Sequence, residues 1–190
     1  MADKYSNFRD LSGREKEGVD FMIEIDDRGS NYVVIAIHGG NIEFVTTKIA
    51  KAISAESHSF YSLVGLKKEQ NRDLHITSTN FDEPKCINLI NKCQTVISVH
   101  GKAGADKHLM VGGLNQDLIR MISSSLKAAG YKVLETSQKL SGILPQNVCN
   151  RCLSRKGIQL EISRGLRDSL AADNVELSRF CEAVRSAFML

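Results

Sequence analysis

The sequence predicts an α/β fold, in which a central mixed, mostly parallel β-sheet is flanked by helices in a single domain spanning residues 1–190. Apolar, β-branched runs typical of buried strands alternate with segments of helical apolar spacing, and the connections between them are short. The 190 residues, 42% hydrophobic and 25% charged, suffice for one compact globular core. With only two prolines and no repeat of fixed period, nothing divides the chain into separate domains.

The first half of the chain is expected to supply an edge strand, a buried strand and a helix. Residues 19–25 alternate roughly between apolar and polar side chains, as in a half-buried edge strand. Residues 32–37 are six apolar residues rich in β-branched side chains, which predicts a strand buried on both faces. Beyond the His-Gly-Gly sequence at 38–40, apolar residues recur at spacings of three and four over residues 42–54, which predicts a helix.

The second half repeats this strand and helix pattern. A short helix is expected at 86–90, and an apolar strand at 95–99 again ends in His-Gly. The remaining predicted elements are a strand at 108–113, a helix from 115 to 129 closed by Gly130, strands at 132–135 and 157–162, and a helix from 174 to 189.

Potential metal ligands follow or end the predicted buried strands. His38 follows the first, His100 follows the second, and Glu161 lies in the last. Parallel strands bring such ends to the same edge of a sheet, where ligands bind. Glu43 joins them if the two-glycine turn before it folds its carboxylate back over the strand end. Two histidines and one carboxylate form a catalytic zinc set that leaves one position open.

Glu161 is the candidate general acid/base. Its neighbours Leu160 and Ile162 should face the opposite side of the strand, so Glu161 shares its face with Gln159 and Ser163. A carboxylate within a sheet is costly unless a partner such as a metal stabilises it. Zinc activates water at neutral pH, and a second carboxylate is then needed to move the proton to the leaving nitrogen.

Simpler interpretations remain open for each of these residues. Histidines at strand ends are often ordinary hydrogen-bonded residues, and Glu161 could be an ion-paired residue of an edge strand. Cys149 and Cys152 have the spacing of half a zinc knuckle or of a redox pair, but no matching second pair follows. The five cysteines are an odd number, and a chain of this length needs no disulfide cross-links, which favours a reducing compartment.

Several motifs, taken in order, resemble the poly-γ-glutamate hydrolase family of Bacillus and its phages. The resemblance covers the chain from about Tyr5 to Arg167. The motifs are Ile37-His38-Gly39-Gly40-Asn41-Ile42-Glu43, Leu74-His75-Ile76-Thr77-Ser78-Thr79, Phe81-Asp82-Glu83-Pro84, Ser98-Val99-His100-Gly101, Val111-Gly112-Gly113 and the stretch from Gly157 to Arg167.

The resemblance implies a carboxypeptidase A-like fold and a zinc-dependent hydrolase with one Zn²⁺ per chain. It implies His38, Glu43 and His100 as metal ligands and Glu161 as the general acid/base, the same set that the strand ends suggest. Carboxypeptidases usually space their first His and Glu by three, whereas here the gap is five. The comparison therefore supports the fold more than exopeptidase specificity.

Substrate-binding residues are expected among the arginines near the last strand. Poly-γ-glutamate carries a free α-carboxylate on each unit, which a guanidinium can bind through two parallel hydrogen bonds. Arg164 and Arg167 follow the Glu161 strand directly, and Arg151 is a second choice. The alternative for the arginines is a solvated basic face at a helix start. We expect His75, in an apparently half-buried strand, to support the site or contact substrate, or else to be a core histidine.

The composition limits the classes of binding partner that we expect. A net charge of +3 is compatible with an anionic polymer, but without tryptophan and with 6% aromatic residues the sequence shows no nucleic-acid surface. No apolar run is long enough to span a membrane and no secretory signal is visible. We expect the protein to be a monomer and, because no signal is visible, to be made in the cytoplasm. The family suggests that host lysis releases it to degrade the polymer in capsules or biofilms.

Two other functions remain open at this point. The first is a zinc amidase that acts on another acidic peptide, such as a γ-D-glutamyl link of the cell wall. The second is a non-catalytic module that binds an anionic polymer.

Overall fold

The computed structural model describes residues 3–136 and 141–188, which form one domain around a seven-stranded sheet. The strand order is β1-β3-β2-β4-β7-β5-β6, and four of the six neighbouring pairs are parallel, which confirms the predicted mixed, mostly parallel sheet. Only β1 with β3 and β5 with β7 are antiparallel. The strands are β1 (Phe21–Asp26), β2 (Tyr32–Gly40), β3 (Ser59–Gly65), β4 (Thr95–Lys102), β5 (Leu109–Gly113), β6 (Val133–Leu134) and β7 (Ile158–Ser163).

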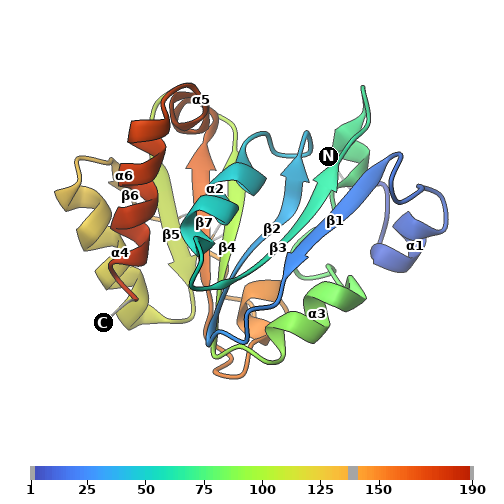
Figure 1. The fold of residues 1–190 in the computed structure, drawn as a ribbon, viewed down its shortest axis with the longest axis horizontal. Helices are drawn as coiled ribbons and strands as arrows, with labels where there is room; N and C mark the ends of the chain where they lie inside the picture. The colour runs from blue at the N-terminus through green and yellow to red at the C-terminus, as the bar shows by residue number, and fades with distance from the viewer. Residues whose placement is uncertain (1–2, 137–140, 189–190) are drawn as a thin grey trace.

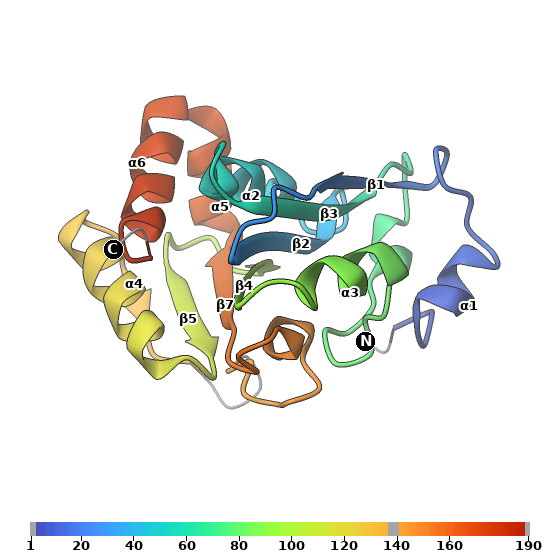
Figure 2. The ribbon, with the colours of Figure 1, turned by 60° about the horizontal axis from the view of Figure 1, so that its bottom comes forward.

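Helices cover both faces of this sheet. Figure 2 shows α2, α5 and α6 on one side of the central strands, and α3 with the segment around η3 on the other. The α-helices are α1 (Phe8–Ser12), α2 (Thr46–Ser54), α3 (Pro84–Ile90), α4 (Gln116–Ala128), α5 (Arg164–Ala172) and α6 (Asn174–Arg185), and the 3₁₀ helices are η1 (Asn71–Leu74) and η3 (Val148–Arg151).

The apolar run of β2 is explained by these two layers. Val34 and Ala36 pack into the core beneath α2, α4, α5 and α6, while Val33, Ile35 and Ile37 pack into the core on the side of α1 and α3. Successive side chains of a strand point to opposite faces, so a strand covered on both sides needs apolar residues at every position. The prediction of a strand buried on both faces is therefore confirmed.

Some predicted elements differ in extent from those observed. The helix expected from residue 42 begins at Thr46, because residues 41–45 form turns and Val45 adopts a left-handed φ of 76°. The strictly alternating strand at 157–162 is buried at every position of β7, since its polar residues face the site described below rather than solvent. The likeness to the carboxypeptidase A class stays a prediction.

Other elements were not predicted at all. The strand β3 begins with Ser59 and its apolar residues are interrupted by Ser62, so it was not predicted, although it is fully buried between β1 and β2. The hydroxyl of Ser62 is satisfied within the sheet, where it donates to the carbonyl of Ala36. The strand expected around His75 is wrong, because η1 and a loop occupy that region.

Among residues 3–136 and 141–188, none of the helices combines the length and the apolar character that crossing a bilayer would require.

Candidate metal centre

Three of the predicted site residues lie on adjacent parallel strands at one edge of the sheet. His38 is on β2, His100 on β4 and Glu161 on β7, and β4 lies between the other two strands. Figure 1 shows β2 and β7 running toward the same edge. In the register of β4 and β7, His100 is directly opposite Glu161. The sheet therefore brings together residues that are far apart in the sequence.

A tight turn adds Glu43 to this group. Gly40 adopts a φ of +61°, and the backbone N–H of Glu43 then donates to the carbonyl of His38 at 2.9 Å. This turn directs the carboxylate over the strand ends, where Oε2 accepts a hydrogen bond of 2.8 Å from the N–H of Gly101 on β4. The left-handed conformation is one that glycine adopts without strain, which accounts for the residue at position 40.

The ligand atoms of His38, Glu43 and His100 have the spacing that a tetrahedral metal site requires. Nδ1 of His38 lies 3.3 Å from Oε2 of Glu43 and 3.3 Å from Nδ1 of His100, and Nδ1 of His100 lies 3.8 Å from Oε2. Ligands about 2.1 Å from a tetrahedral zinc ion are about 3.4 Å apart from one another. The donor types and their separations therefore fit zinc.

The far nitrogens of both imidazole rings are held by hydrogen bonds. Nε2 of His38 lies 2.9 Å from the carbonyl of Ile76, and Nε2 of His100 lies 2.8 Å from Oγ of Ser98. A carbonyl can only accept, so Nε2 of His38 donates to Ile76, and Nδ1 is the nitrogen that faces Glu43 and His100. This arrangement is typical of histidines that ligate metals.

A third histidine, His75, lies beside His38 and Glu43. Its ring stacks on that of His38, with centroids 3.9 Å apart, and its Nε2 lies 4.0 Å from Oε1 of Glu43. Its Nδ1 lies 2.6 Å from the carboxylate of Asp3. His38, Glu43 and His75 also have ligand atoms within 4.8 Å of one another, so two candidate ligand sets share His38 and Glu43.

Burial and neighbouring charges shift the ionisation of these groups in opposite directions. Burial raises the pKa of Glu43, but His38, His100 and the Gly101 N–H outweigh it and lower this pKa to about 2. Burial lowers the pKa of His100 to about 3, and its attraction to Glu43 offsets this only in part. The pair thus provides a carboxylate and a neutral imidazole at neutral pH, the forms that bind a metal.

Glu161 differs from Glu43 in its surroundings. It is 6% exposed, and burial together with the negative charge of Glu43 raises its pKa to about 7. Its Oε1 accepts a hydrogen bond of 2.9 Å from the amide of Gln159, whose own oxygen accepts one from Asn147. Two carboxylates in one site with separated pKa values are typical of acid–base chemistry.

Three predicted arginines occupy three different environments. Arg151 donates to the carbonyls of Gln146, Phe81 and Thr79, and it lines neither cavity described below. Its guanidinium therefore holds these loops together, and its expected role in substrate binding stays a prediction that no contact among the described residues supports.

Arg167 is only 5% exposed and donates to the carbonyls of Phe44, Lys102 and Ile162. Arg164 is exposed, pairs with Asp168 and lies over the ring of Phe44, 5.2 Å from its centroid. Of the three, Arg164 alone combines exposure with a place on a cavity wall, whereas the guanidinium of Arg167 is engaged by the backbone.

Two adjoining cavities meet at Glu43. The histidine cavity, about 650 Å³, is lined by His38, His75, His100 and Glu161, and its rim includes the exposed Ile143 and Leu144. The arginine cavity, about 620 Å³, is lined by cationic residues, among them Lys102, Arg164 and Arg167. The shared wall consists of Glu43, Arg72, Gly101, Lys102 and Ala103.

Four residues that line these cavities were not predicted from the sequence: Asp3, Arg72, Lys102 and Asn147. Arg72 lies on the 3₁₀ helix η1 and Asp3 precedes α1, so neither has a strand-end signal. Lys102, two residues after His100, could have been found from its place at the end of the predicted strand. Cys149 and Cys152 are buried free thiols, and burial raises the pKa of Cys149 well above its usual value.

The fold and the site together define a single-domain α/β protein with a histidine and carboxylate centre at the carboxyl ends of its parallel strands. The sequence model of the poly-γ-glutamate hydrolase family matches residues 5–183. The chain therefore belongs to the poly-γ-glutamate hydrolase family, as its motifs suggested.

Relatives of known structure share the whole architecture. A bacteriophage poly-γ-glutamate hydrolase superposes with a TM-score of 0.92 at 32% identity, covering 98% of this chain and 96% of that one. The zinc-free form of YndL superposes with a TM-score of 0.92 at 33% identity, covering 98% and 97%.

The curated relatives are longer than the region they share with this chain. The prophage-derived protein YoqZ of Bacillus subtilis is 40% identical over 164 residues, which are 85% of this chain and 59% of YoqZ. YndL of Bacillus subtilis is 37% identical over 88% of this chain and 67% of its own length. The chain thus spans about three fifths of YoqZ.

Proposed function

We propose that this chain is a zinc-dependent hydrolase that cleaves the γ-glutamyl amide bonds of poly-γ-glutamate. The observation that carries the proposal is the convergence of Nδ1 of His38, Nδ1 of His100 and Oε2 of Glu43, with the buried Glu161 opposite His100 on the next strand. Family membership supports the choice of polymer, and the solved bacteriophage relative is a hydrolase of that polymer.

We assign the zinc ligands to His38, Glu43 and His100. Their separations of 3.3 to 3.8 Å are shorter than the 4.0 Å between His75 and Glu43. When bound there, one zinc ion per chain would polarise the amide carbonyl and lower the pKa of a water molecule.

Glu161 moves the proton in this proposal. As a carboxylate it accepts a proton from the attacking water, and as an acid it donates that proton to the leaving nitrogen. A pKa near 7 suits both steps, because the group then exchanges protons readily at neutral pH. The Gln159 amide bonds Oε1 and so fixes the plane of the carboxylate. No covalent enzyme intermediate is needed.

The arginine cavity would bind the α-carboxylates of the polymer. Arg164 and Arg72 present exposed guanidinium groups on the wall of this cavity, with 55% and 56% of their side chains accessible. The Arg72 Nη1 lies 3.9 Å from Oε1 of Glu43, so this arginine borders both cavities. Guanidinium groups bind carboxylates with two parallel hydrogen bonds, which would orient each γ-glutamyl unit.

Digestion of purified poly-γ-glutamate tests this function. We expect the viscosity to fall and free amino groups to rise with the zinc-loaded protein, a chelator to stop both changes, and added zinc to restore them. A zinc-loaded protein that leaves the polymer intact would contradict the proposal. If it cleaves a γ-D-glutamyl cell-wall peptide instead, it is the rival amidase; if it only binds the polymer, it is the non-catalytic module.

Glu161→Gln separates the general base from the metal ligands. We expect turnover to fall by about 10³ or more, because the proton transfer is lost, while the zinc content stays at one per chain. Glu24→Gln, on the edge strand β1, is the matched control and should leave turnover unchanged. Loss of zinc from Glu161→Gln would make Glu161 a ligand rather than the base.

A further inference from the structure

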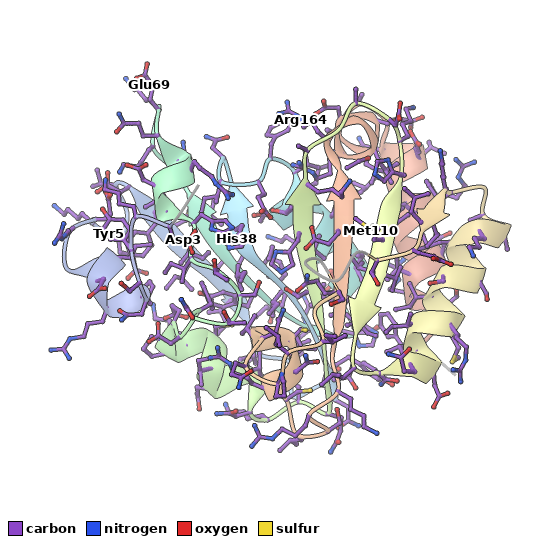
Figure 3. All side chains as sticks on the ribbon, turned by 180° about the vertical axis from the view of Figure 1, so that it is seen from behind. Asp3, Tyr5, His38, Glu69, Met110 and Arg164 are labelled. Carbon is purple, nitrogen blue, oxygen red and sulfur yellow. The ribbon has the colours of Figure 1, made fainter. Side chains whose placement is uncertain are left out.

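The carboxylate of Asp3 divides its two oxygens between two partners beside the metal centre. Oδ1 lies 2.6 Å from Nδ1 of His75, while Oδ2 accepts hydrogen bonds of 2.6 Å from both the backbone N–H and the hydroxyl of Thr77. Only 16% of the Asp3 side chain and 14% of the His75 side chain are exposed. Figure 3 labels Asp3 close to His38, on which the His75 ring stacks.

This geometry determines which ring nitrogen of His75 carries the proton. A carboxylate can only accept, so Nδ1 bears the hydrogen and Nε2 keeps its lone pair. The stack on His38, with 23° between the ring planes, fixes the rotation of the imidazole. Nε2 then lies on the wall of the histidine cavity. Its distance of 4.0 Å from Oε1 of Glu43 is too long for a hydrogen bond between the two atoms.

We propose that Asp3 is a positioning residue, which holds His75 so that its Nε2 accepts a hydrogen bond from an amide N–H of the bound substrate. The inference rests on the proposed function, because a γ-linked polyamide offers one N–H donor at every link. A lone pair and a carboxylate oxygen that face the same part of the cavity favour a group that donates hydrogen bonds. Arg72, 3.9 Å from Oε1, already offers one cation there, which disfavours a second metal ion.

The contacts of Asp3 allow its positioning role to be distinguished from a simple anchoring of the N-terminal segment. Thr77 contacts the oxygen of Asp3 that His75 does not use, so Thr77→Val weakens the anchor without touching the bond to His75. Lys4 also anchors the segment, through an ion pair of 2.7 Å with Asp73. Variants at Thr77 therefore serve as matched controls for variants at Asp3.

Nuclear magnetic resonance of the metal-free protein tests the positioning directly and without catalysis. We expect the wild-type and Thr77→Val proteins to show His75 protonated at Nδ1, and Asp3→Ala to lose this preference. The signals are assigned by their absence in His75→Gln. If His75 of the folded wild-type protein is protonated at Nε2, the proposal is overturned, even should Asp3→Ala fail to fold.

Kinetics on γ-linked oligomers then test what His75 does. We expect Asp3→Ala and His75→Ala each to lower kcat/KM by about tenfold, the effect of one lost hydrogen bond, and Thr77→Val to change it less than about twofold. Because Asp3 acts through His75, adding Asp3→Ala to His75→Ala should cost nothing more. Effects that multiply instead would refute the positioning role.

Zinc affinity, measured by chelator competition, distinguishes the remaining outcomes. We expect Asp3→Ala and His75→Ala to bind zinc as tightly as the wild type, within about threefold, because neither residue hydrogen-bonds a proposed ligand, which is the contact through which supporting residues affect metal affinity. A large loss in both would make His75 a metal ligand and overturn the substrate contact. An inactive wild-type enzyme would refute the proposed function, whereas an active one with independent effects at Asp3 and His75 would refute this inference alone.

Discussion

The two cavities that meet at Glu43 are built from different kinds of structure. In the histidine cavity, His38, His100 and Glu161 project from three neighbouring strands, and hydrogen bonds hold each side chain. In the arginine cavity, Arg72 and Arg164 project from a 3₁₀ helix and from the start of α5, and more than half of each side chain is exposed.

The contrast fits the division of labour that the proposed function requires. A metal site and a proton-transfer group need positions fixed to within a fraction of an ångström, which buried strands provide. Binding a flexible anionic chain requires charge at the surface, and exposed arginines can adjust to it. The largest predicted effects on chemistry therefore lie in the histidine cavity, and the smaller effects on affinity lie in the arginine cavity.

The sharpest test of this contrast is the loss of a proposed ligand. We expect His100→Ala to weaken zinc binding by more than about 1,000-fold, since even residues that only support a ligand contribute about 10- to 100-fold. His108→Ala removes an imidazole that bonds Lys102 instead, and it should leave zinc affinity unchanged. Equal effects of the two variants, measured by chelator competition, would place the metal elsewhere.

Arg167 lines the arginine cavity but, unlike Arg72 and Arg164, is buried. We expect Arg167→Met to lower the free energy of unfolding by about 3 kcal/mol, because buried carbonyls of Phe44, Lys102 and Ile162 lose a charged donor. Arg164→Met should cost less than about 1 kcal/mol, as its ion pair with Asp168 is exposed. Urea denaturation measures the free energy of unfolding of both variants. Equal losses would show that the two arginines do not differ in their contribution to stability.

The pH dependence of stability tests the burial of Glu161. Its pKa of about 7 lies above the usual 4.5, so the folded state binds this proton more tightly than the unfolded chain does. Stability is therefore lost as the pH rises, by about 2 kcal/mol between pH 5 and 7.

Urea unfolding of the metal-free protein at several pH values measures this slope, and Glu161→Gln is the control. Subtracting the two curves removes the contributions of groups that both proteins share. A flat difference curve would show that Glu161 ionises as easily in the folded protein as in the unfolded chain, and a curve that rises with pH would show that it ionises more easily in the folded protein.

The smallest effect is expected in the arginine cavity. Arg72→Gln and Arg164→Gln should each raise KM for poly-γ-glutamate by about threefold to tenfold, since an exposed charge contributes about 1 kcal/mol, and kcat should hardly change. The effect should shrink at high salt, which screens exposed charges. Arg120→Gln, on α4 away from both cavities, is the matched control. A fall in kcat with unchanged KM would assign these arginines to the chemistry.

Much of the fold could be predicted from the sequence, because local patterns report burial. The apolar run in β2, the helical spacing in α4 and the His-Gly pairs at the ends of β2 and β4 are visible without coordinates. The strand β3 was missed because it contains two serines, and only the folded chain shows what satisfies their hydroxyls: the carbonyl of Ala36 on β2 for Ser62, and the backbone N–H of Arg28, between β1 and β2, for Ser59.

The sequence by itself determined which side chains could carry the chemistry. His38, Glu43, His100 and Glu161 were chosen from residue type and strand position, and the structure brings them together. Only the tertiary structure decided which arginines are exposed and that Asp3 contacts His75. The reason is physical: a strand pattern fixes the side on which a residue lies, but the partners of a loop residue depend on segments that the chain brings close only when it folds.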